Sequence, residues 1–156
     1  MDPAPGEPRF EVDAMLVKLA RYLRCLGYDA SCEPELSLAR RLARAKAQGR
    51  AFLTRSTRFD EPGVKVVLVR RDDPVEQLAQ VIGEARLDPR ARLFTRCIRC
   101  NVPLAEVRKD EAVRARVPAG VWLQHERYWS CPSCATVFWH GSHVANTCRK
   151  LGIEPP

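Results

Sequence analysis

The sequence lacks any long hydrophobic run, and no stretch approaches the roughly 20 consecutive apolar residues that a membrane-spanning helix needs. Its first residues, Met1 to Arg9, are rich in proline and lack the basic start and apolar stretch of a signal peptide. We therefore expect a cytoplasmic protein with no membrane partner. No long Gly/Ser linker occurs either, so any two modules should pack against each other.

Acidic residues are missing from one part of the chain, between Leu36 and Phe59. A positively charged surface favours a polyanion, because binding releases the counterions of a phosphate chain. Charge alone does not separate this interpretation from an ordinary solvated helix face. The segment contains seven basic residues, namely Arg40, Arg41, Arg44, Lys46, Arg50, Arg55 and Arg58, within a chain of net charge +7.

The composition supports a folded core and changes near residue 90. Hydrophobic residues make up 46% of the chain and charged residues 29%, a balance that argues against disorder. All three tryptophans, all three histidines and both C-x-x-C pairs follow the break at Asp88-Pro89-Arg90. We therefore predict a first domain over 10–90 and a small module over 91–150.

Strands and helices alternate in the first 90 residues. The helix that opens at Asp13 repeats apolar residues at helical spacing from Leu16 to Leu26, and Gly27 is suited to end it. This alternation predicts an α/β fold, with a parallel sheet flanked by helices. The predicted strands are 9–12, 28–32, 51–54 and 64–69, and the other predicted helices are 35–48 and 73–85.

The seven cysteines favour a metal site over disulfides. Their number is odd, the expected compartment is reducing, and four of them form two C-x-x-C pairs. Two such pairs supply the four sulfurs of a tetrahedral structural zinc site, whose closed shell holds structure and does no chemistry. The predicted ligands are Cys97, Cys100, Cys131 and Cys134, with a 30-residue insert, 101–130, between the pairs.

The remaining cysteines and histidines give weaker signals. Cys25 and Cys32 are expected to be structural because they lie on an apolar helix face and at a strand end. His140, His143 and Cys148 could replace a zinc ligand or bind a second ion, although polar surface positions in the module are the simpler interpretation.

Several carboxylates follow predicted strands or open predicted helices, where α/β proteins place functional groups. Asp13 follows the first strand, and the sequence leaves open whether it is a metal ligand, a helix N-cap, or both. Glu35, Asp60 and Asp72 are the other candidates, and such a group could hold Mg²⁺ or Mn²⁺ for phosphodiester hydrolysis. Asp73, followed by Pro74, is instead expected to cap a helix.

The motifs resemble, in order and spacing, the Mut-seven C-terminal RNase domain family. They cover about residues 10–150, and comprise the run from Asp13 to Asp29, Phe52-Leu53-Thr54-Arg55, Val69-Arg70-Arg71-Asp72-Asp73-Pro74, Leu93-Phe94-Thr95-Arg96-Cys97, Cys131-Pro132-Ser133-Cys134 and Trp139-His140-Gly141-Ser142-His143. The resemblance implies a PIN-like, metal-dependent ribonuclease fold with a zinc ribbon, in which Asp13 is the first metal-binding acid and Glu35 the helix acid.

One position departs from the family pattern. The family usually carries an aspartate directly after Leu-Thr-Arg, where this chain has Ser56, and a hydroxyl binds Mg²⁺ weakly compared with a carboxylate. Either Asp60 or Asp72 compensates, or the protein is a weak or inactive nuclease that still binds RNA.

Three functions therefore stay open. The first is an RNA endonuclease that uses Mg²⁺ or Mn²⁺, and the second is an RNA-binding module with a degraded site. In both, Arg40, Arg44, Arg55 and Arg58 are the predicted nucleic-acid contacts. Aromatic residues of the module could stack bases in the second, or simply form the module's core. The third is a protein-interaction ribbon on an inert scaffold.

Overall fold

The computed structural model describes residues 6–58 and 61–156, so the predicted carboxylate Asp60 lies outside the described residues. Its first part is built around a parallel sheet with the strand order β2-β1-β3-β4. The strands are β1 (Arg9–Val12), β2 (Asp29–Ser31), β3 (Ala51–Thr54) and β4 (Val66–Leu68). The chain moves outward from β1 to β2 and then crosses back to β3, so the strand order reverses between β1 and β3.

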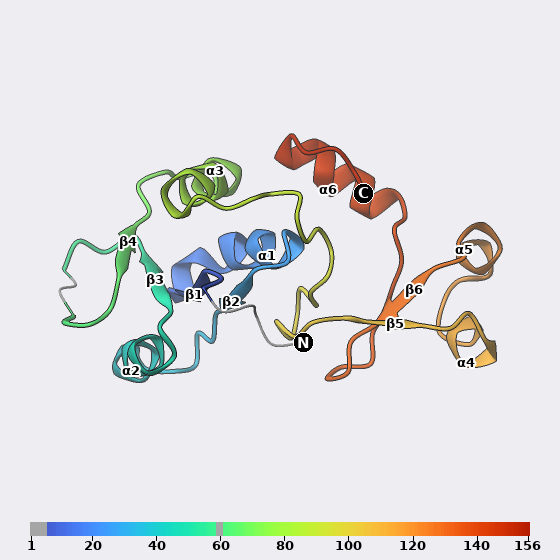
Figure 1. Cartoon of the computed structure of the whole chain (residues 1–156), viewed down its shortest axis with the longest axis horizontal. Helices are drawn as coiled ribbons and strands as arrows, with labels where there is room; N and C mark the ends of the chain where they lie inside the picture. The colour runs from blue at the N-terminus through green and yellow to red at the C-terminus, as the bar shows by residue number, and fades with distance from the viewer. Residues whose placement is uncertain (1–5, 59–60) are drawn as a thin grey trace.

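Helices cover both faces of this sheet. Figure 1 shows α1 (Val17–Cys25) and α3 (Pro74–Ala85) on one side of the strands and α2 (Leu38–Gln48) on the other. The predicted α/β class, with a parallel sheet between helices, is confirmed.

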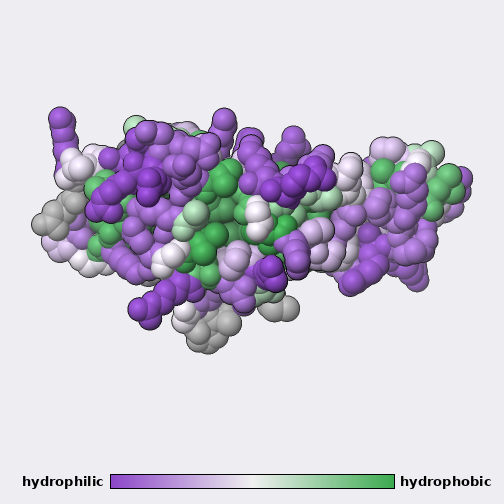
Figure 2. All heavy atoms as spheres, turned by 90° about the horizontal axis from the view of Figure 1, so that it is seen from above, coloured by the Kyte–Doolittle hydropathy of each residue, from purple (hydrophilic) through white to green (hydrophobic). Residues whose placement is uncertain are grey.

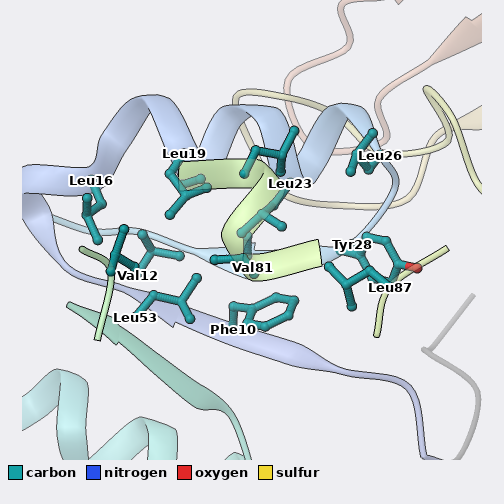
Figure 3. Packing of buried hydrophobic residues seen from close by; sticks show 14 of the residues in the cluster. Phe10, Val12, Leu16, Leu19, Leu23, Leu26, Tyr28, Leu53, Val81 and Leu87 are labelled. Carbon is teal, nitrogen blue, oxygen red and sulfur yellow. The ribbon is translucent and has the colours of Figure 1, made fainter. Parts of the chain in front are cut away.

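The main core lies between the sheet and the α1–α3 layer. Successive residues of a strand point to opposite faces, so Phe10 and Val12 of β1 face this core. Leu19 and Leu23 of α1 pack onto them with no exposed surface (Figure 3). Glu11 and Asp13 alternate with these residues, and their side chains bond to α2 instead.

Local sequence explains where most helices begin and end. Asp73 caps α3, accepting hydrogen bonds from the backbone N–H groups of Val75 and Glu76. Gly27, after α1, has φ +88°, and an added Cβ would lie 2.2 Å from the Arg92 carbonyl oxygen. The predicted start of the second helix is wrong, because Ser37 caps α2 and Glu35 lies in the preceding turn.

The second part of the chain contains a small antiparallel sheet, ordered β5-β6-β7. Its strands are β5 (Ala105–Val107), β6 (Tyr128–Ser130) and β7 (Val137–Phe138), and two short helices, α4 (Glu111–Arg114) and α5 (Ala119–Gln124), lie between β5 and β6. Val113, Tyr128 and Val137 form a separate small core there.

The last helix, α6 (Ser142–Leu151), returns to the first sheet's helices, as Figure 1 shows. Leu151 and Ile153 pack against the main core, and the Lys150 ammonium lies 5.6 Å from the centroid of the Tyr22 ring of α1. Contacts therefore cross the boundary near residue 90, and the division into two domains there stays a prediction.

The surface is largely polar. Figure 2 shows hydrophilic residues over most of one face, with hydrophobic residues gathered near the middle of the molecule. Within residues 6–58 and 61–156, no helix combines the length and apolar character needed to cross a membrane.

Candidate functional site: a four-cysteine centre and an acidic strand edge

The two C-x-x-C pairs meet where the small sheet joins the first part of the chain. The sulfurs of Cys97, Cys100, Cys131 and Cys134 all lie within 4.8 Å of one another. Four thiolates at this separation provide the donor set of a closed tetrahedral zinc site. The cluster can therefore hold a metal ion such as zinc.

Each pair lies in a turn of the same construction. The backbone N–H of Cys100 points to the Cys97 sulfur at 3.4 Å, and the N–H of Cys134 points to the Cys131 sulfur at 3.5 Å. Each turn ends on a left-handed residue, Asn101 or Ala135, both with φ +59°. Asparagine tolerates this conformation, whereas alanine is strained in it.

Two of the thiols, Cys97 and Cys134, differ in acidity before a metal binds. Burial raises the pKa of Cys97 to about 12, whereas hydrogen bonding to Thr136 lowers the pKa of Cys134 to about 6. Metal binding must displace the proton from the buried thiol, so affinity should fall as the pH falls.

The first cysteine turn is fixed to the parallel sheet by hydrogen bonds. Arg24 of α1 donates to the carbonyl oxygens of Ile98 and Arg99, at 2.9 and 3.2 Å. The Asn101 amide accepts from the Ala30 backbone N–H at 3.0 Å and donates to the Asp29 carboxylate at 2.7 Å. This half of the metal centre is thus part of the β2 edge.

A second polar cluster lies at the carboxyl ends of β1 and β3, where the strand order reverses and α/β proteins bind ligands. One Asp13 oxygen accepts from Arg41 at 2.8 Å and from the Ala14 backbone N–H at 2.7 Å. The other accepts from the Thr54 hydroxyl at 2.7 Å. Asp13 is therefore the N-cap of the short 3-10 helix Ala14–Leu16, and an ion-pair partner of α2.

The Asp13 carboxylate is ionised in this arrangement. Burial alone would raise its pKa, but the hydrogen bonds from Arg41, Thr54 and Ala14 outweigh burial and hold the pKa below the ordinary aspartate value. The Thr54 hydroxyl in turn accepts the Ser56 backbone N–H at 3.1 Å, which joins the position of the missing aspartate to the same network.

The neighbouring buried acid is also neutralised by α2. Glu11 is completely buried, and Arg44 donates to both of its oxygens, at 2.8 and 2.9 Å. The same guanidinium pairs with Glu33. A buried carboxylate is costly unless it is paired, so Arg44 has a structural partner already.

Among the described residues, Glu35 and Asp72 do not join Asp13 in a metal-binding cluster. Glu35 is exposed in the turn before α2, and the Asp72 side chain is 89% exposed and pairs with Arg55. Within the described part of the chain, the cysteine cluster is the one group of three or more metal-binding side chains with closely spaced ligand atoms. The catalytic roles of Asp13, Glu35, Asp60 and Asp72 stay predictions.

The predicted RNA-contacting arginines differ in availability. Arg40 and Arg58 are exposed, and Arg55 is exposed beside its partner Asp72, whereas Arg44 is held by two carboxylates. Their contact with RNA stays a prediction.

Sequence reasoning missed Arg41, Thr54 and Glu11 as members of this cluster. One available signal was Glu11, a charged residue between the apolar Phe10 and Val12 of the strand. The other was the i, i+3 spacing of Arg41 and Arg44, which places both on one helix face.

A parallel sheet with a polar strand edge is followed by a ribbon whose four clustered cysteines can hold a metal ion. The model of the Mut7-C RNAse domain matches residues 8–151, and the chain therefore belongs to this family. The predicted family is confirmed. No curated protein and no solved structure matches the chain.

Proposed function

We propose that this protein binds RNA through the carboxyl edge of its parallel sheet, and that its own cleavage activity there is weak or absent. The observation that supports this proposal is that both carboxylate oxygens of Asp13 already accept hydrogen bonds. The donors are Arg41, Thr54 and the Ala14 backbone N–H. Membership of an RNase domain family supports RNA as the partner.

The residues at this edge do not fit a divalent cation as they stand. Mg²⁺ and Mn²⁺ sites in nucleases use several converging carboxylates, whereas among the described residues Asp13 has Arg41 against it and belongs to no group of three metal-binding side chains. Ser56 stands where the family's aspartate is expected. A guanidinium at this position supplies positive charge toward a phosphate without a metal.

Exposed arginines near the edge provide the RNA contacts in this proposal. Arg40 and Arg58 are exposed, and Arg55 can exchange its solvent-facing partner Asp72 for a phosphate. An exposed ion pair contributes little stability, so this exchange costs little.

The second candidate is a metal-dependent ribonuclease, favoured by the family match itself. For this activity, the ion pair between Arg41 and Asp13 has to break, and a second carboxylate has to move close to Asp13 so that both can bind the metal ion. Under either candidate, we propose zinc as the metal of the four-cysteine centre, where it stabilises the ribbon.

Cleavage of a labelled mixed-sequence RNA distinguishes the two candidates. Wild type, Asp13→Asn and Ser56→Asp are compared with Mn²⁺, Mg²⁺ or EDTA. We expect no metal-dependent cleavage by wild type, and its appearance in Ser56→Asp. Cleavage by wild type that disappears in Asp13→Asn would establish the ribonuclease instead.

Binding is measured separately, by fluorescence anisotropy of a single-stranded RNA at several salt concentrations. The double variant Arg40→Ala/Arg58→Ala should bind more weakly, with a salt slope smaller by roughly 0.7 for each lost phosphate contact. Arg114→Ala in α4 is the matched control, since its side chain is 60% exposed and lies in the ribbon insert. Equal losses in the control and the double variant would contradict binding at the sheet edge.

A further inference from the structure

A hollow of about 80 Å³ lies between the end of α1, the small sheet and α6. Its walls include the rings of Phe94, Trp129 and His140. The hollow lies at the junction of the two parts of the molecule and contains none of the four clustered cysteines.

The three rings form a continuous aromatic surface. Trp129 and His140 are stacked, with centroids 4.4 Å apart and planes at 15°, and Phe94 lies 6.1 Å from His140 at 60°. Burial, followed by the nearby charge of Arg127, lowers the pKa of His140 and so favours its neutral ring. This contact covers one face of each ring, so a planar base can stack only on the faces that the pair leaves open.

Phe94 reaches this surface from an unfavourable backbone conformation. Its φ is +56°, in the left-handed region that bulky side chains avoid, and its N–H donates to the Cys25 carbonyl oxygen at 2.8 Å. Strain of this kind persists where the surrounding structure imposes it, and it concentrates at ligand sites.

Two basic residues, Arg127 and Arg99, lie next to residues that line the hollow, namely Trp129 and Ile98. The Arg127 guanidinium lies 5.2 Å from the centroid of the Trp129 ring and is 68% exposed, and Arg99 is exposed beside the first cysteine turn. Arg127 also pairs with Glu106, which is 52% exposed. From Ala91 onward the chain has ten basic and five acidic residues, so this region complements a phosphate chain.

We infer that this hollow is a stacking site for one pyrimidine base of a single-stranded RNA, an inference that rests on the proposed RNA-binding function. The volume is smaller than the ~150 Å³ cavity that admits a whole benzene molecule. The base therefore enters edge first and leaves part of its ring in the open mouth, an arrangement that suits a single ring better than a purine. Arg127 and Arg99 contact the flanking phosphates.

The test is fluorescence anisotropy with labelled oligo-U, oligo-A and an abasic oligonucleotide of equal length. Trp129→Ala should weaken oligo-U binding by about 5- to 100-fold, the range for one lost base stack, and leave the abasic strand unaffected. Trp129→Phe, which keeps a ring, should restore most of the affinity. Trp122→Ala is the matched control, because that tryptophan stacks on Tyr128 and does not line the hollow.

The outcomes separate this inference from the function on which it rests. Undiminished oligo-U binding by Trp129→Ala would overturn the stacking site and leave RNA binding intact, whereas no RNA binding by wild type would overturn both. Equal affinity for oligo-A and oligo-U would overturn the single-ring assignment.

A second measurement uses unaltered protein, in case Trp129→Ala fails to fold. Oligonucleotides containing 4-thiouridine are photo-crosslinked to wild type and the sites mapped by mass spectrometry. Crosslinks within 94–98, 127–129 or 138–143 are expected, and crosslinks confined to other segments would overturn the site.

Discussion

Asp13 links the carboxyl end of β1 to the helix on the far face of the sheet. It caps the first turn after β1 and pairs with Arg41 of α2 across the layer boundary. A metal ion or an RNA phosphate at this edge would have to compete with contacts that hold α2 on the sheet. Any ligand bound there is therefore coupled to the position of α2.

The first prediction concerns the acid stability of Asp13→Asn. The pKa of Asp13 is held below its ordinary value of about 3.9, so its ionised pairing contributes fully above pH ~4 and is lost as the pH falls through the folded-state pKa. At pH 7 the variant should lose about 2 kcal/mol in the free energy of unfolding, because Arg41 stays buried without its charge partner.

Urea unfolding from pH 7 down to pH 3 measures this difference. The gap in unfolding free energy between wild type and Asp13→Asn should begin to narrow below pH ~4, where the carboxylate becomes protonated in the unfolded state but stays ionised in the folded state. Asp72→Asn, at an exposed position, is the control and should show little gap at any pH. A constant gap for Asp13→Asn across the range would contradict the ion-pair account.

The sequence predicted some residues of the two candidate sites but not the side chains that pair with them. Asp13 was placed by its position after a strand, and the four cysteines by their spacing. The Arg41 and Arg44 partnerships could not be predicted, because they depend on how α2 crosses the far face of β1, a three-dimensional relation that spacing along one chain does not encode.

At the scale of secondary structure, local capping signals were reliable where they were strong. Asp73 followed by Pro74 predicted the start of α3, and the structure begins the helix there. The start of α2 was misplaced because Glu35 is a good helix former, whereas the Ser37 hydroxyl provides the cap.

The second prediction tests that cap. Asp73→Ala removes the acceptor for the backbone N–H groups of Val75 and Glu76, and should cost about 1 kcal/mol in the free energy of unfolding. Asp72→Ala is the matched neighbour, which accepts no cap bond through its side chain in α3 and should cost about 0.5 kcal/mol or less. If urea unfolding gave the same loss of unfolding free energy for Asp73→Ala and Asp72→Ala, the hydrogen bonds of the Asp73 cap would contribute nothing beyond the charge of the side chain.

The elements of the second part were harder to predict. Strands β5 to β7 are two or three residues long, too short for a period-two pattern to emerge. Helix α6 buries Val144 and Cys148, and its last residue, Leu151, packs against the main core of the first part of the chain. The helix therefore does not belong to the ribbon alone.

At the scale of the whole molecule, the four-cysteine cluster lies between two structural regions. One cysteine turn is bonded to α1 and β2, and the other joins β6 to β7. Loss of the metal should therefore loosen the ribbon relative to the parallel sheet as well as destabilise the ribbon itself.

The third prediction follows from this arrangement. Cys131→Ser removes one of four sulfurs, so we expect a sharp fall in bound zinc and a lower melting temperature. Zinc content is measured by elemental analysis and unfolding by circular dichroism. Cys148→Ser, also at a buried cysteine but outside the cluster, should retain its zinc. A full complement of zinc with unchanged melting in Cys131→Ser would rule out the four-cysteine centre.

Residues 108–127 form the connection between β5 and β6. Val107 and Tyr128 are paired across the small sheet, so the chain leaves and re-enters at neighbouring points. A protease cut within 108–127 would divide the chain into two pieces that each carry two of the four thiolates. After such a cut, the two pieces would still be paired through β5 and β6. A metal ion bound by all four cysteines would hold the same two pieces together.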